Sequence, residues 1–203
     1  MKTLSEIDTT SKRAAKGAGF SWGISEEIGK NMRLLELFGL SGIKNLNKYL
    51  KDYKKKQFQK IALISEINET KKNPFCPIIL GTNFIDQVNL FDKKNNIKII
   101  NVAFPILFLP FVSRASEVIG KRIFLKIDEK EFLLNFNQSI YSNYLNGDIV
   151  EKATKIKVKF VENKNTFNEK EWKELYTLSE ETFVEESEEL KQTAAGAGLT
   201  DND

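Results

Sequence analysis

Two helical patterns joined by a glycine-rich segment occupy residues 5–39, and they constrain the fold more than any other stretch. The joint reads KRAAKGAGFSWG and holds three glycines, three alanines and three cations. Glycine weakens a helix by about 1 kcal/mol relative to alanine, so Gly17 and Gly19 either turn the chain or admit a second element. Ala15, Gly19 and Gly23 are four residues apart, and a continuous helix would place them in one groove. We therefore expect close helix packing here.

The helical patterns on both sides of this joint carry start signals. Residues 3–16 begin with Thr3-x-x-Glu6, in which a hydroxyl accepts from a free amide of the first turn. The stretch 21–38 predicts a helix whose apolar residues recur at helical spacing: Ile24, Ile28, Met32 and Leu35. Ser41 is expected to cap a third helix.

Short apolar runs replace the helical patterns after residue 60. We expect strands at 74–81, 97–102, 106–112, 121–128, 131–136 and 155–162, and helices at 82–91, 113–120 and 168–178. The run 155–162 alternates cleanly, which predicts a strand with one buried face, antiparallel or at an edge. In the last helix, Trp172, Leu175 and Tyr176 are expected to face inward.

This order of helices, mixed strands and a final helix predicts an α+β or mixed α/β fold, with helices covering a largely antiparallel sheet. We expect one domain over residues 1–203. Its parts are helices at 1–58, a strand-rich core at 60–162, a helix and acidic stretch at 168–190, and a Gly-rich tail at 191–203.

Composition excludes several kinds of chemistry. The chain has no histidine, which removes the commonest general base and metal ligand. Cys76 is the single cysteine, so neither an intrachain disulfide nor a cysteine zinc site can form. We expect a cytoplasmic protein with no bound cofactor or metal. The N-terminus has no apolar segment typical of a signal peptide, and the apolar run 97–112 is too short and polar for a membrane helix.

The N-terminal joint is a candidate anion site. It lacks the spacing of a Walker A loop or a dinucleotide fingerprint. Consecutive backbone amides and a helix beginning at Ser21 can still bind a carboxylate or phosphate. Lys12, Arg13 and Trp22 would complete this site. The alternative is that the segment only packs helices together.

Three residues are candidates for catalysis: Glu26, Asp86 and Cys76. Glu26 and Glu27 are adjacent on a helix and point about 100° apart, so only one can face a given site. The apolar residues around Cys76 indicate burial, which raises a thiol pKa and makes the thiol inert. The simpler interpretation of the carboxylates is a solvated surface.

Two charged segments suggest partners. The outer face of the third helix is basic (Lys44, Lys48, Lys51, Lys54, Lys55 and Lys56), typical of a nucleic-acid surface or of a solvated helix face. The acidic stretch 180–189 can neutralise this face within the molecule. The chain ends with AGAGLTDND, and we expect Thr200, Asp201, Asn202 and Asp203 to fold back near residues 12–22, unless the tail is disordered.

The two ends together resemble an uncharacterised bacterial family, known as a domain of unknown function. The resemblance rests on SEIDTTSKRAAKGAGFSWGISEE near the start, CPxxLG at 76–81 and GAGLTDND at the end. It implies no activity, substrate or cofactor. It does imply that Lys12, Arg13, Ser21, Trp22, Glu26 and the last four residues belong to one functional or structural unit.

No catalytic constellation emerges from these patterns. The favoured function is therefore a non-catalytic accessory protein that docks a partner enzyme, or a second copy, through its small-residue helices and its tail. The alternative is a metabolic protein or enzyme that binds a small carboxylate or phosphate. A third, weaker hypothesis is nucleic-acid binding through residues 44–56. No membrane partner is expected.

Overall fold

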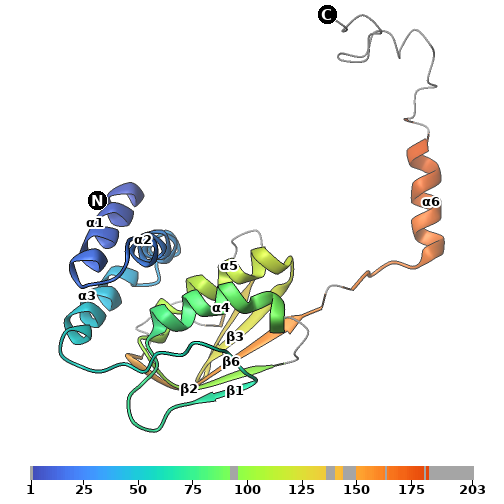
Figure 1. Cartoon of the computed structure of the whole chain (residues 1–203). Coiled ribbons are helices and arrows are strands. Elements are labelled where there is room, and N and C mark those ends of the chain that lie inside the picture. Colours follow the sequence, from blue (N-terminus) through green and yellow to red (C-terminus); the bar gives the residue numbers. More distant parts are fainter. Residues whose placement is uncertain are drawn as a thin grey trace, which may run out of the picture. The chain divides into compact units, whose positions relative to one another are not determined.

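The computed structural model describes residues 2–91, 96–135, 140–143, 150–162, 164–180 and 182. The chain divides into two compact units, Met1–Asn163 and Lys164–Asp203, where the sequence analysis expected one domain. The first unit holds three N-terminal helices, a six-stranded sheet and two further helices (Figure 1). The second unit contains one described helix, and the tail lies outside the described residues.

The N-terminal helices are α1 (Leu4–Gly17), α2 (Trp22–Leu37) and α3 (Gly42–Tyr53). The predicted capping box is confirmed, because the Thr3 hydroxyl accepts from the Glu6 amide and the Glu6 carboxylate accepts from the Thr3 amide. The chain turns between α1 and α2 at Gly19, whose φ of +105° lies in the region that favours glycine. The three helices therefore fold back on one another.

The start of α3 differs from the expectation. Ser41 has a left-handed backbone and its side chain makes no capping hydrogen bond. Glu36, at the end of α2, supplies the cap instead, because its carboxylate accepts from the Ile43 amide at 2.8 Å. This contact fixes the angle between the two helices from outside the α3 sequence.

The sheet has the strand order β1-β2-β6-β3-β4-β5. Its strands are β1 (Ile67–Glu69), β2 (Ile97–Ala103), β3 (Arg122–Ile127), β4 (Lys130–Leu134), β5 (Ile140–Ser142) and β6 (Lys152–Val161). Among the pairs of these described strands, β1–β2 is parallel and the other four are antiparallel. The predicted alternation of β6 is confirmed, because Ile156, Val158 and Phe160 are buried. This strand lies between β2 and β3 and is antiparallel to both, so it is not an edge strand.

Two predicted strands are helical. The segment 74–81 enters α4 (Pro77–Phe91), and the run 106–112 forms a short 3-10 turn, η1 (Pro105–Leu107), and the start of α5 (Leu109–Ile119). Both helices are largely buried, so these two segments are apolar on all sides. Such a run has no polar periodicity that distinguishes a strand from a helix. The expected helix at 82–91 is confirmed as the main part of α4, and the one at 113–120 as the end of α5.

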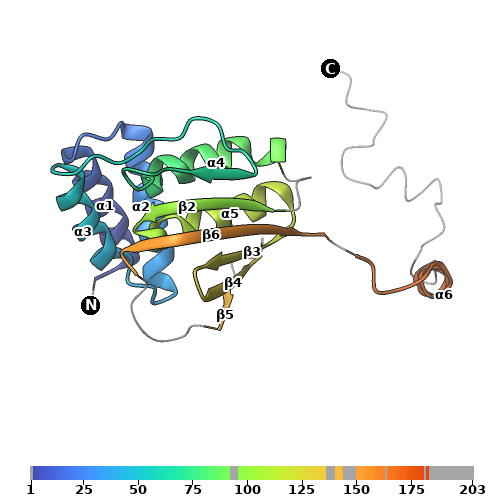
Figure 2. The same ribbon diagram turned by 90° about the horizontal axis from the view of Figure 1, so that it is seen from below.

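The helices α4 and α5 lie side by side on one face of the sheet, and α1 to α3 lie at one end of it (Figure 1, Figure 2). The core between α4, α5 and the sheet is apolar, with Phe84, Phe108, Phe111 and Phe132 fully buried. Segregated helices over a mostly antiparallel sheet make this an α+β fold, as predicted.

The second unit contains α6 (Glu169–Glu180), close to the predicted bounds. The expectation that its apolar residues face inward is wrong for this unit, because α6 buries no residue. Trp172, Leu175 and Tyr176 are 49%, 61% and 51% exposed. No helix of the described residues is long and apolar enough to cross a bilayer.

Candidate functional site

The helices α1 and α2 approach each other closely at Gly29. A Cβ there would lie 2.4 Å from Asp8 Oδ1 and 2.9 Å from the Asp8 carbonyl oxygen. The expected small-residue packing therefore exists, but its centre differs from the expectation. A Cβ at Gly19 or Gly23 would meet open space, because the turn at Gly19 prevents one continuous helix. Of these small residues, Ala15 and Gly29 are buried, while Gly19 and Gly23 stay exposed.

Two of the predicted anion-binding residues lie at the start of α2. The Ser21 hydroxyl caps the helix by accepting from the Ile24 amide at 3.4 Å. The Trp22 ring is exposed, and the Lys16 ammonium lies 5.2 Å from its centroid in a cation–π contact. These contacts are local to the α1–α2 turn, so they position the turn without a ligand.

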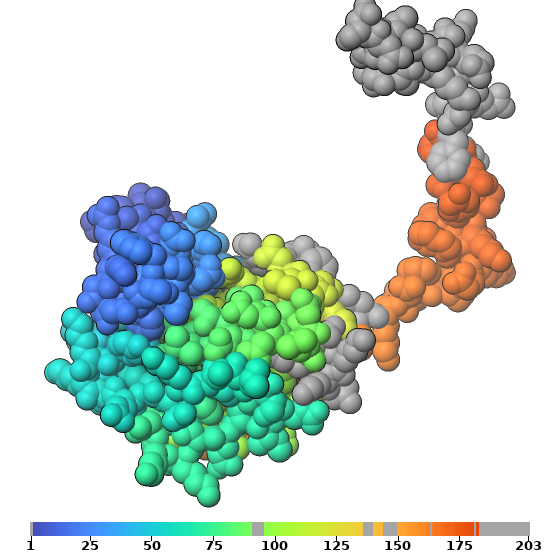
Figure 3. Space-filling model, viewed as in Figure 1, coloured from blue at the N-terminus to red at the C-terminus, as the bar shows by residue number. Residues whose placement is uncertain are grey.

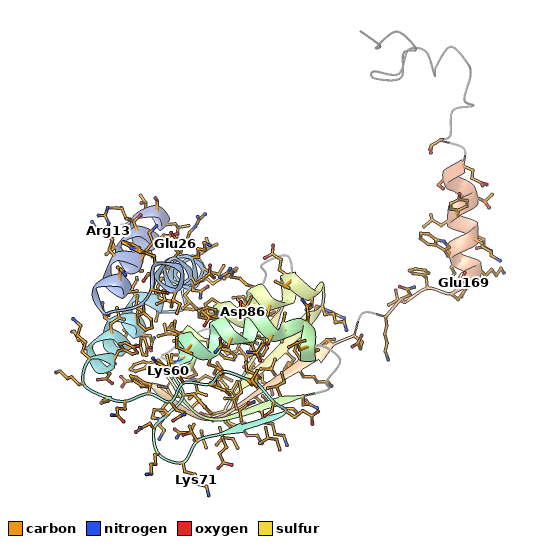
Figure 4. All side chains as sticks on the ribbon, viewed as in Figure 1. Arg13, Glu26, Lys60, Lys71, Asp86 and Glu169 are labelled. Carbon is orange, nitrogen blue, oxygen red and sulfur yellow. The ribbon has the colours of Figure 1, made fainter. Side chains whose placement is uncertain are left out.

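The other two predicted anion-binding residues lie on α1. The Lys12 ammonium is 4.0 Å from Glu26 Oε1 on α2, a partly exposed pair. Arg13 is exposed on the outer side of α1 (Figure 4). The structure therefore directs one of the two cations toward α2 and the other away from it, and binding of an anion at this segment stays a prediction.

A cavity of about 500 Å³ opens between α2, α4 and α5. It brings together Ser21, Glu26 and Asp86, three residues that the sequence singled out from segments far apart. In the space-filling view the N-terminal helices lie directly against α4 and α5 (Figure 3). The rest of the lining comprises Gly23, Ile24, Glu27, Thr82, Ile85, Phe111 and Arg114. This cavity has a mixed lining of carboxylates, an arginine and apolar side chains.

An ion pair forms one wall of this cavity. The Arg114 guanidinium of α5 donates to the Glu27 carboxylate of α2, and the Lys30 ammonium donates to the same carboxylate at 3.0 Å. Burial raises the pKa of Glu27, but the hydrogen bonds from Arg114 and Lys30 outweigh it and hold the pKa below its ordinary value. A general base for neutral pH needs a raised carboxyl pKa, so Glu27 is suited to binding a cation and not to proton transfer.

A second cavity, of about 290 Å³, lies along the same side of α2 and shares Arg114 with the first. Its cations are Lys30, Arg33 and Arg114, and its single carboxylate is Glu117. The remaining lining residues are Leu34, Leu37, Ser113 and Asn135. Three cations beside two leucines favour an anion that carries an apolar group.

The predicted catalytic residues are not brought into one constellation. Glu26 and Asp86 line the larger cavity from α2 and α4, but Cys76 lies elsewhere, in the core. Its thiol accepts from the Ile79 amide at the start of α4 and lies 3.0 Å from the Tyr49 hydroxyl. Burial raises the pKa of Cys76, against the lowering effect of these hydrogen bonds. Cys76 therefore caps the start of α4 and contacts a buried tyrosine.

The other predicted binding segments are the basic residues 44–56, the acidic stretch and the C-terminal tail. In the basic segment 44–56, Lys48 pairs with Glu151, and Lys56, which follows α3, pairs with Asp52 in the last turn of that helix at 2.7 Å. The acidic residues 181 and 183–189 and the tail residues Thr200, Asp201, Asn202 and Asp203 lie outside the described part of the chain. Within that part, no group of three or more His, Cys, Asp or Glu side chains is placed to hold a metal ion.

An apolar face on α6 is a second candidate binding surface. Trp172, Leu175 and Tyr176 recur at helical spacing, and Phe167 stacks on Trp172 with ring centroids 5.5 Å apart. Leu178 is also exposed. Charged side chains fill the other side of the helix, so α6 is amphipathic, and the described residues of its unit leave its apolar face uncovered.

The sequence reasoning missed Arg33 and Arg114. One signal for them was available, because the chain has only four arginines among 31 cations. Arginine forms planar, two-pronged hydrogen bonds with carboxylates, which lysine cannot replace. Two of the four arginines line one cavity, which makes this part of the surface a candidate binding site.

The fold and the two cavities define an α+β protein with a charged cleft beside its N-terminal helices. Residues 2–76 match the model of a family described as "Protein of unknown function (DUF3726)". The match covers α1 to α3 and confirms, for that segment, the expected resemblance to an uncharacterised family. No curated protein and no solved structure matched the chain.

Proposed function

We propose that this chain is a non-catalytic interaction protein that docks a partner protein through the apolar face of α6. The observation that carries the proposal is an amphipathic helix with exposed Trp172, Leu175 and Tyr176 and no buried residue. Amphipathic helices bind apolar grooves through anchors at this spacing, and tryptophan and tyrosine are common among the residues that dominate binding energy.

The chemistry of the partner surface follows from the charges around this face. Within α6, Glu169, Glu171, Glu174 and Glu180 outnumber Lys170 and Lys173. We therefore expect an apolar groove with a basic rim. A contribution from the small-residue helices stays part of the proposal: Ala15 and Gly29 are buried, while Gly17, Gly19 and Gly23 are exposed. A contribution from the tail stays part of the proposal, and so does the cytoplasmic location.

The test is affinity purification of the full chain from its native host, with Leu175→Glu beside Lys173→Glu. The first substitution places a charge in the apolar face, and the second reverses a charge on the polar side of the same helix. We expect Leu175→Glu to lose its partner and Lys173→Glu to keep it. In a Trp22→Phe background, the emission of Trp172 should shift to shorter wavelength when the purified partner is added. Retention of the partner by Leu175→Glu would refute the proposal.

A second candidate function is the binding of a small organic anion in the 290 Å³ cavity. It rests on the convergence of Lys30, Arg33 and Arg114 beside Leu34 and Leu37. Ligand binding to the folded state alone raises the melting temperature, so thermal shifts with phosphate, citrate and aromatic carboxylates test it. Arg33→Gln should abolish any shift, while Lys55→Gln, in the turn after α3, should leave it unchanged.

A further inference from the structure

Within the described residues of the first unit, one face of the sheet has no helix over it. Both α4 and α5 lie on the opposite face, and Figure 2 shows the strands from the uncovered side. Residues of alternate register point to this side, because their neighbours along each strand are buried in the core. They are Lys98 and Ile100 of β2, Lys155, Lys157 and Lys159 of β6, Arg122, Phe124 and Lys126 of β3, Glu131 and Leu133 of β4, and Tyr141 of β5. We call this set the open face.

A row of lysines crosses the open face. Lys157 of β6 lies directly opposite Lys98 of β2 on one side and Lys126 of β3 on the other. Like charges placed opposite each other destabilise a sheet, so this row costs stability in the chain alone. Lys126 is neutralised by Glu131 at 3.1 Å and by Glu129 at 3.4 Å.

The other lysines of the open face have no such neighbour. Among the described residues, the side-chain ammonium groups of Lys98, Lys155, Lys157 and Lys159 have no hydrogen-bond or ion-pair partner. All four belong to the adjacent strands β2 and β6. Four cations on two neighbouring strands form a surface that favours a ligand with several negative charges in succession.

Apolar side chains form a second row beside these cations. Phe124 of β3 lies opposite Lys159 of β6 and opposite Leu133 of β4, which in turn lies opposite Tyr141 of β5. Tyr141 is 62% exposed. Two aromatic rings and a leucine, in register across three strands, make a flat surface on which planar groups can stack.

The net charge of the whole first unit is also positive, as a surface for an anionic ligand requires. Residues 1–163 contain 27 lysines and arginines against 17 aspartates and glutamates, a formal charge of +10. Residues 164–203 contain 4 against 11, a formal charge of −7. The overall value of +3 thus conceals a strongly basic folded unit.

We propose that the open face binds single-stranded nucleic acid. The lysines of β2 and β6 bind successive phosphates, and Phe124 and Tyr141 stack on unpaired bases. Stacking on a sheet needs bases that are not enclosed in a duplex, which favours a single strand over a double helix. An anionic membrane would meet the lysines, but it supplies no planar groups for the aromatic row. The surface is distinct from the residues 44–56 that the sequence suggested for this role.

The test measures binding of the full chain to fluorescein-labelled 20-nucleotide oligothymidine and oligouridine by anisotropy. Four phosphate contacts predict a slope of about −3 for log affinity against log salt, or roughly a 50-fold loss between about 50 and 200 mM salt. Lys157→Gln should make the slope shallower by about 0.7. Tyr141→Ala should weaken binding about tenfold at fixed salt without changing the slope. Comparing the two oligonucleotides distinguishes DNA from RNA.

The matched control is Lys51→Gln with Lys54→Gln, which removes exposed charge from the last turn of α3 and from its C-cap. The control should bind as the wild type does. Equal weakening by the control and by Lys157→Gln would overturn the proposal, since it would show only the general attraction of a basic protein. Three other results would also overturn it: no binding at about 50 mM salt, a duplex of equal length binding as tightly, or binding to anionic vesicles without binding to oligonucleotides.

Discussion

The contact between α1 and α2 can be tested with two alanine substitutions in the same helix. Alanine is favoured over glycine in a helix by about 1 kcal/mol, and this gain applies to Gly23 and Gly29 alike. At Gly23 the new Cβ meets open space, so Gly23→Ala should raise the free energy of unfolding by about 0.5–1 kcal/mol. At Gly29 the Cβ would meet Asp8 Oδ1 at 2.4 Å and the Asp8 carbonyl oxygen at 2.9 Å.

The expected cost at Gly29 follows from these distances. The carboxylate can rotate away, but the carbonyl oxygen moves only with α1. Overpacking of this kind costs about 1–3 kcal/mol, which exceeds the gain in helix propensity. We therefore expect Gly29→Ala to lower the free energy of unfolding by up to about 2 kcal/mol, so the same change has opposite signs at two sites six residues apart in one helix.

The assay is urea unfolding followed by circular dichroism, with thermal unfolding as a second measurement. A change of 1 kcal/mol should shift the melting temperature by about 2–4 °C for a chain of this size. The Asp8→Ala, Gly29→Ala double variant separates the two contacts. If the carbonyl oxygen limits the approach, removal of the carboxylate restores little stability. A Gly29→Ala variant as stable as Gly23→Ala would refute the reasoning.

Three further substitutions have expected outcomes. Gly81→Ala would place a Cβ 2.2 Å from the fully buried Phe111 ring, so it should lose more unfolding free energy than Gly29→Ala, and Phe111→Leu should partly restore it. Because the folded pKa of Glu27 is depressed, its ion pairs stabilise the fold above about pH 4.3 and are lost as pH falls through the folded value. Acid titration of stability between about pH 5 and pH 3 should therefore be steeper for the wild type than for Glu27→Gln. Glu36→Ala removes the cap of α3 and should cost about 1 kcal/mol in chemical unfolding, with Glu36→Gln retaining part of it.

Local patterns in the sequence predicted the elements that have one exposed face. The helix α2 was found because its apolar stripe stands out against polar neighbours, and β6 because its lysines alternate with buried residues. The run at 106–112 has no such contrast, since Leu107, Phe108 and Phe111 are all buried. A strand and a buried helix have the same pattern there, and only the surrounding elements decide between them.

For one of the wrongly predicted elements, the sequence does contain a local indication of the true structure. The segment 74–81 was interpreted as a strand, but proline is favoured at the first position of a helix. Pro77 occupies that position, with Cys76 before it as the cap. Cysteine is not among the residues that normally cap helices, which concealed the start of α4.

The residues of the charged cleft were predicted only in part. Glu26 and Asp86 were singled out by residue type, but their common cavity depends on the packing of α2 against α4. Glu27 and Arg114 are 87 residues apart in the chain, and nothing near either residue indicates the other. The sequence revealed the lysines of the open face along β6 alone. That Lys98 of β2 lies beside them follows only from the pairing register of the sheet.

The buried thiol of Cys76 has a practical consequence. It is the single cysteine of the chain and is 1% exposed, between the Tyr49 ring of α3 and the first turn of α4. A thiol reagent can reach it only when these helices separate. The rate of its modification in native buffer therefore reports how often this part of the core opens, compared with the frequency of complete unfolding. The chain carries its own reporter for local opening, at the residue where the family match ends and α4 begins.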